Sequence, residues 1–109
     1  MSRGRLDVER DASHQIIGGA RQLGWRAVAA KAPDTSGFAA LVLIHPQVPG
    51  ARWVEVVADS TAGETRDTVE AWRHDLVRAG AIHTIVRVPS GIDTLLADLR
   101  EVTTTRIAS

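Results

Sequence analysis

Apolar residues recur at helical spacing near the start of the chain, and they predict a first helix over residues 7–23. Its buried face is expected to carry Ala12, Ile16, Ile17, Ala20 and Leu23. Gly24 follows, in the place where helices commonly end on a glycine. The Gly18–Gly19 pair inside this helix costs roughly 1 kcal/mol per glycine relative to alanine. It therefore predicts close packing of the helix on a sheet, with a kink or an earlier helix end as the alternative.

Three strands are predicted to follow this helix. A short strand covers residues 25–31, and the continuous apolar run at 39–44 is typical of a central strand that is buried on both faces. A third strand covers residues 52–58. Prolines, glycines and small polar residues predict a loop at 32–38 and a turn at 45–50 between these strands.

The third strand carries a carboxylate among apolar neighbours. Side chains alternate along a strand, so Trp53, Glu55 and Val57 share one face. The opposite face carries Val54, Val56 and Ala58. Glu55 can pair with an arginine in a structural contact, or it can be what remains of a functional site.

The second half of the chain predicts a helix, a strand and a further helix. Thr61 and Glu64 have the spacing of a capping box, and Gly80 ends the helix that they begin. The buried stripe of this helix is expected to consist of Val69, Trp72, Leu76 and Ala79. A β-rich run at 82–88 predicts the fourth strand, which Pro89 ends.

The last helix is expected to be capped by Ser90, with Leu95, Leu96, Leu99 and Val102 on its apolar side. Residues 102–109 are predicted to form a frayed tail. The order α-β-β-β-α-β-α predicts an α/β fold, a mixed sheet flanked by helices with a right-handed crossover within residues 52–88. We expect a single domain over 1–109, with its core at about 7–101, a short N-terminal arm and a C-terminal tail.

Composition narrows the class of protein. The chain has 109 residues, 13 basic and 13 acidic, and its net charge of zero argues against a strongly basic coat for nucleic acid but allows a local basic face. Because cysteine is absent, disulfides, cysteine-ligated zinc and thiol catalysis are excluded. No apolar run approaches the ~20 residues of a membrane helix, and no signal peptide precedes the first helix. We expect an intracellular protein without a membrane partner, cytoplasmic or, if phage-encoded, associated with the virion.

Four short segments carry a resemblance to a known family. They are Arg-Gln-Leu-Gly-Trp-Arg at 21–26, Gly-Phe-Ala-Ala-Leu-Val-Leu at 37–43, Trp-Val-Glu-Val-Val at 53–57, and the later run from Glu-Ala-Trp to Ala-Gly-Ala within 70–81. In their order and spacing, the chain resembles the VRR-NUC and Holliday-junction-resolvase branch of the restriction-endonuclease-like nucleases, over about residues 8–99. The resemblance implies an α-β-β-β-α-β core and metal-dependent cleavage of DNA.

The family's functional residues match this sequence only in part. The aspartate that binds a divalent metal in active members corresponds to Ala40, and the Glu-x-Lys pair of the next strand corresponds to Glu55 and Val57. A glutamine of the second helix corresponds to Val69, and a glutamate of the first helix matches Glu9. The resemblance therefore implies that Glu9 and Glu55 would be the metal ligands of an active protein, and that the aspartate and the lysine are lost.

These losses remove the chemistry of the site as it is matched. Metal-assisted hydrolysis of a phosphodiester needs carboxylates around Mg²⁺ and a group that activates water. Neither Ala40 nor Val57 supplies a ligand or a charge. We therefore expect no cofactor, or Mg²⁺ if activity survives. The alternative is a relocated site, in which Lys31, the only lysine, joins Glu55 as a catalytic residue, with Asp34 and Asp59 near the same edge of the sheet.

Arginines are the candidate nucleic-acid contacts. Arg10, Arg66 and Arg73 could bind phosphates, although interleaved acidic residues also fit a solvated, salt-bridged helix face. The four histidines lack the spacing of a metal motif, and no glycine-rich phosphate loop is present.

Three hypotheses about function follow. The first is a catalytically inactive VRR-NUC-like protein that acts as a nucleic-acid-binding or assembly module. The second is an active, metal-dependent DNA endonuclease or resolvase with relocated catalytic residues. The third is a structural component of a phage particle or mobile element. DNA, a second copy in a homodimer and another protein are the partners that these hypotheses imply.

Overall fold

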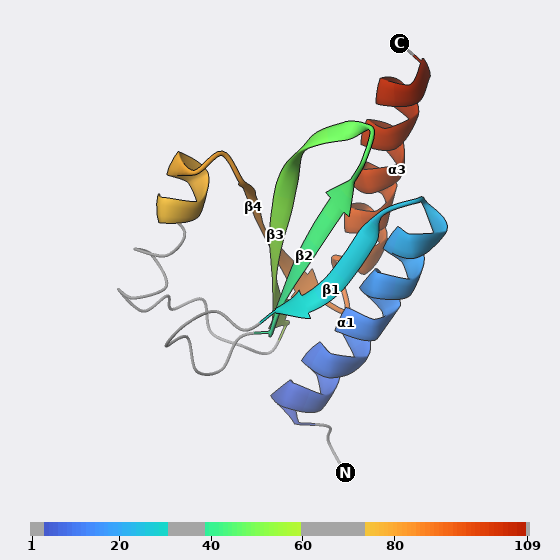
Figure 1. The fold of residues 1–109 in the computed structure, drawn as a ribbon. Helices are drawn as coiled ribbons and strands as arrows, with labels where there is room; N and C mark the ends of the chain where they lie inside the picture. The colour runs from blue at the N-terminus through green and yellow to red at the C-terminus, as the bar shows by residue number, and fades with distance from the viewer. Residues whose placement is uncertain (1–3, 31–38, 60–73, 109) are drawn as a thin grey trace.

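The computed structural model describes residues 4–30, 39–59 and 74–108. The elements are α1 (Arg5–Gln22), β1 (Arg26–Ala30), β2 (Ala39–His45), β3 (Val48–Ala58), β4 (Ile82–Val88) and α3 (Ile92–Ala108), and residues 74–78 are also helical. Together they form an α/β fold, in which α1 and α3 lie on one side of a sheet (Figure 1). Of the helices in the described ranges, none is long and apolar enough to cross a membrane.

The sheet is mixed, as the sequence predicts. Its strand order is β1-β2-β3-β4, with β1 and β3 antiparallel to β2 and with β4 parallel to β3. Leu41 of β2 lies opposite Val54 of β3, and Val54 lies beside Thr84 of β4. This register aligns the apolar positions of neighbouring strands on a common face.

The hydrophobic core lies between that face and the helices. Leu41, Val54 and Leu99 have no exposed surface, which for side chains of this size is a contribution of about 1.5–3 kcal/mol each. The core as a whole consists of Ala12, Ile16, Ala20, Trp25, Ala27, Leu41, Leu43, Val48, Val54, Val56, Val86, Val88, Ile92, Leu95 and Leu99. The apolar stripe predicted for the first helix is thus confirmed as its buried side.

The two glycines inside α1 differ in their surroundings. A Cβ atom at Gly19 would lie 2.7 Å from Cδ1 of Leu96, whereas a Cβ atom at Gly18 would meet nothing within 4 Å. The prediction of close packing is confirmed at Gly19, but the partner is α3 and not the sheet. Gly24, just beyond the helix, has φ of +89°, a conformation that favours glycine.

The predicted turn at 45–50 is wrong in extent. β2 continues through His45, β3 begins at Val48, and these two residues pair across a turn of two residues. The backbone N–H of Gln47 donates to Nδ1 of His45 over 3.0 Å, so the side chain of His45 stabilises this turn. The expectation that residues 39–44 are buried on both faces also fails at Ile44, which is 48% exposed.

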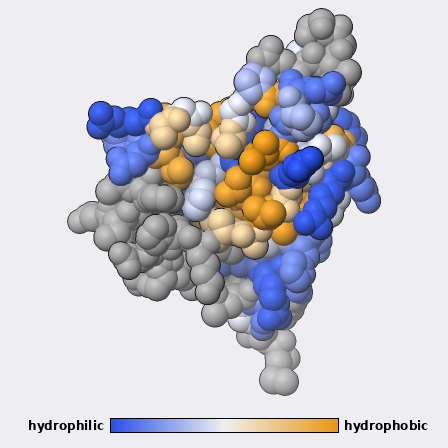
Figure 2. Space-filling model, viewed as in Figure 1, coloured by the Kyte–Doolittle hydropathy of each residue, from blue (hydrophilic) through white to orange (hydrophobic). Residues whose placement is uncertain are grey.

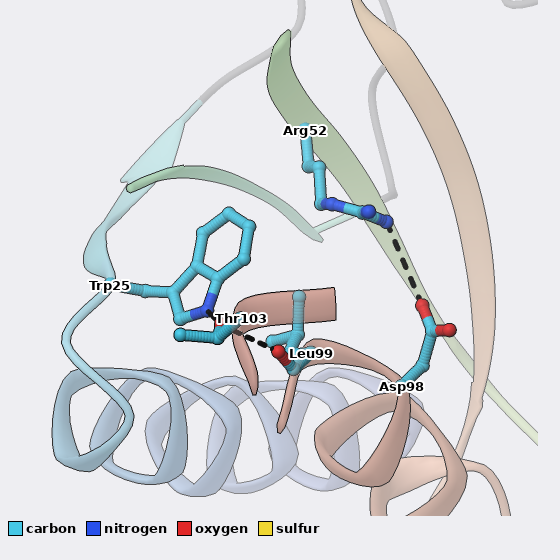
Figure 3. A network of polar contacts seen from close by, with 5 residues as sticks. All are labelled: Trp25, Arg52, Asp98, Leu99 and Thr103. Atoms are coloured by element: carbon cyan, nitrogen blue, oxygen red, sulfur yellow. Dashed lines mark hydrogen bonds and ion pairs between the residues drawn. The ribbon is translucent and has the colours of Figure 1, made fainter. Parts of the chain in front are cut away.

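The predicted frayed tail is instead a continuation of α3, which extends to Ala108. Thr103 is buried, accepts a hydrogen bond from Nε1 of Trp25 over 2.9 Å and donates one to the carbonyl of Leu99 over 2.7 Å (Figure 3). Nearby, Arg52 lies 3.6 Å from Asp98 and 5.7 Å from the centre of the Trp25 ring. These contacts fasten the C-terminal half of the helix to β3 and to the residue before β1.

The helix predicted between β3 and β4 falls largely outside the described residues, including Val69 and Trp72. Within the described part, Leu76 is half-buried and Ala79 is exposed, so the predicted buried stripe does not extend to Ala79. Gly80 has φ of +90° and follows the helical residues 74–78, as its predicted role at a helix end requires.

The predicted cap of the last helix is also wrong. α3 begins at Ile92, two residues after Ser90. The hydroxyl of Ser90 donates to Oδ1 of Asp59 over 2.7 Å, and its backbone N–H donates to Oδ2 over 3.1 Å. Ser90 therefore joins the end of β3 to the turn before α3.

Candidate functional site

The positions that the nuclease resemblance singles out meet on the face of the sheet opposite the helices. Ala40 of β2 lies directly across from Glu55 of β3, and Val57 is the next residue of β3 on the same face. All three are buried. The alternation predicted from the sequence thus puts a methyl group, a carboxylate and an isopropyl group side by side.

Glu55 is held by a histidine. Its Oε1 atom lies 3.0 Å from Nε2 of His83, and the two side chains are 5% and 11% exposed. In the parallel register, His83 lies beside Trp53, and Trp53 is the residue of β3 that precedes Glu55 on the same face. The predicted structural partner of Glu55 is an arginine; the contact described here is with an imidazole, whose ring N–H can donate to the carboxylate.

An arginine lies beside the position where the resemblance expects a lysine. Val57 pairs with Arg87 of β4, and Nη1 of Arg87 is 3.5 Å from the carbonyl oxygen of Ala58. The sequence analysis missed both His83 and Arg87 as neighbours of this site. Their spacing of four residues in the fourth strand puts them on one face, but only the register with β3 shows which face that is.

Glu9 approaches the same end of β3 from the other side of the sheet. It is 1% exposed, and its Oε2 atom accepts a hydrogen bond from the backbone N–H of Ala58 over 3.1 Å. Ala58 belongs to the core face, which α1 covers, whereas Glu55 belongs to the opposite face. The two carboxylates proposed as metal ligands are therefore bound to different groups, one to a strand end and one to His83.

Of the other candidate residues, some lie within the described ranges and some lie outside them. Arg10 forms an exposed ion pair with Asp7 on the first turns of α1, at 2.9 Å, and Asp59 binds Ser90. The remaining candidates lie outside the described residues: Lys31, Asp34, Arg66 and Arg73. The structure thus brings together positions 40, 55 and 57, and it places Arg10 on the surface of a helix.

Among the described residues, the two matched positions beside Glu55 offer no ligand for a hard divalent cation. Mg²⁺ takes oxygen ligands in a nearly octahedral arrangement. Ala40 and Val57 offer no donor atom, and the carboxylate of Glu55 is bonded to His83. Within the described ranges, no group of three or more histidine or acidic side chains is arranged to hold a metal ion.

No family model, no curated protein and no solved structure matches this chain. The α/β fold is given by the structure, and the resemblance to nucleases rests on the short segments of the sequence alone.

Proposed function

We propose that this chain is a catalytically silent relative of the restriction-endonuclease-like nucleases and acts as a nucleic-acid-binding or assembly module. The observation that supports this most directly is the pairing of Ala40 with Glu55 across β2 and β3. In active members that the chain resembles, the residue across from this glutamate would bind metal. A methyl group in that place offers a metal ion no oxygen ligand beside the glutamate.

Two further features support loss of catalysis. Hydrolysis of a phosphodiester develops negative charge, which a metal ion and a nearby cation must stabilise. Val57 supplies no charge where the resemblance expects lysine. The carboxylate of Glu55 is in contact with His83, whose Nε2 atom lies 3.0 Å from Oε1. The buried carboxylate of Glu55 thus has a partner within its own chain, which offsets part of the cost of burying a charge.

A nuclease assay tests the proposal. The purified protein is incubated with single-stranded, duplex and branched DNA, with Mg²⁺ or Mn²⁺, beside Glu55→Ala and Glu55→Gln variants. We expect no cleavage by the parent with either metal. Metal-dependent cleavage that is lost in Glu55→Gln would overturn the proposal. This variant keeps the size of the side chain and can still accept a hydrogen bond from His83, so its loss of activity would not reflect unfolding.

The binding half of the proposal has its own measurement. Fluorescence anisotropy of labelled DNA at two salt concentrations reports whether the protein is retained on DNA, and phosphate contacts weaken as salt rises. Salt-sensitive binding without cleavage supports a silent nucleic-acid-binding protein. If DNA is not bound, size-exclusion chromatography with light scattering decides whether the chain assembles with itself. A monomer that binds no DNA contradicts both forms of the module.

One observation favours the active alternative, in which catalytic groups have moved. Arg87 is the register partner of Val57, so a cation from β4 stands beside the place of the missing lysine. Arg87→Ala is the variant to compare in the same assay, with Arg100→Ala, an exposed position of α3, as the matched control. An active enzyme that used Arg87 would lose cleavage in the first variant and keep it in the second.

A further inference from the structure

We draw no further inference here: the strongest candidate, the exposed apolar part of the sheet face opposite α1 and α3 that includes Val28 and Ile44, carries nothing because nothing in the structure shows what covers it.

Discussion

On the face of the sheet that α1 and α3 cover, Leu41, Leu43 and Val54 have no exposed surface. On the opposite face, burial is uneven: Ala40 and Val57 are buried, whereas Val28 is 56% exposed and Ile44 is 48% exposed. Figure 2 shows apolar residues gathered on the side turned toward the viewer. Valine occurs on both faces, but the leucines of β2 lie on the covered face, whereas Glu55, His83 and Arg87 lie on the opposite one.

The two faces also differ in their buried polar groups. The helix-covered face buries Glu9 and Thr103 against backbone or indole groups, which tie helices to strands. The opposite face buries Glu55 against His83, which ties β3 to β4. The buried polar groups of the helix-covered face therefore connect the helix layer to the rest of the fold. The buried polar group of the opposite face connects two strands of the same sheet.

The largest difference between the faces is expected from shortening one apolar side chain on each. Leu99→Ala removes a fully buried side chain of α3 and should lower the free energy of unfolding by about 2–5 kcal/mol. Val28→Ala, at an exposed position of the opposite face, should change it by about 0.5 kcal/mol or less. Urea denaturation of both variants measures the difference. Equal losses would mean that Val28 is buried in solution.

The polar pair of the opposite face should come next in size. Glu55→Ala leaves the part-buried imidazole of His83 without this acceptor, at a cost of about 1–3 kcal/mol. Because replacing both partners of a buried pair by apolar groups can be nearly neutral, Glu55→Leu with His83→Leu should recover much of the loss. A double-mutant cycle by chemical denaturation measures the coupling. Additive losses would show that the two side chains do not support each other.

A smaller loss of stability is expected from removing the Thr103 hydroxyl, which accepts a hydrogen bond from Trp25 on the helix-covered side. Thr103→Val keeps the shape of the side chain but removes the acceptor for Trp25, so we expect a loss of about 1 kcal/mol. Thr104→Val, at the exposed neighbouring position, is the matched control. Thermal unfolding followed by tryptophan fluorescence is the measurement. Identical behaviour of the two variants would return residues 102–109 to the frayed tail that the sequence suggested.

The smallest effect separates the two glycines of α1. Gly18→Ala should raise the free energy of unfolding by about 0.5–1 kcal/mol, because alanine is the better helix former and its Cβ meets nothing. Gly19→Ala should gain less or lose stability, because Leu96 must move to admit the methyl group. Comparison of the two urea midpoints tests this order. A Gly19→Ala protein as stable as Gly18→Ala would indicate that Leu96 shifts without cost.

Periodicity predicted most of the described fold. The apolar positions of α1 follow from a repeat of 3.6 residues and are confirmed as its buried side, whereas β3 is buried on both faces from Trp53 to Ala58. The failures have long-range causes. The run of threonines near the end of α3 looks polar and frayed, but Thr103 has its partner in Trp25, 78 residues away in the sequence.

The candidate site divides in the same way. That Glu55 and Val57 share a face follows from strand alternation, and that Ala40 stands near them follows from the order of the matched segments. His83 and Arg87 could not be placed there, because the pairing of parallel strands is not set by a short turn between them. The sequence thus identifies what the site lacks better than what surrounds it.

The contact between Trp25 and Thr103 affects how the nascent chain folds on the ribosome. α1 is synthesised before α3, but Gly19 of α1 packs against Leu96 of α3, and the indole of Trp25 bonds to Thr103 of α3. Until residues 92–103 emerge, Ile16 and Ala20 can pack only against strands, and part of the future core stays open to other molecules. Folding of this part of the chain therefore needs α3, and its aggregation during expression should depend on how quickly that helix follows the strands.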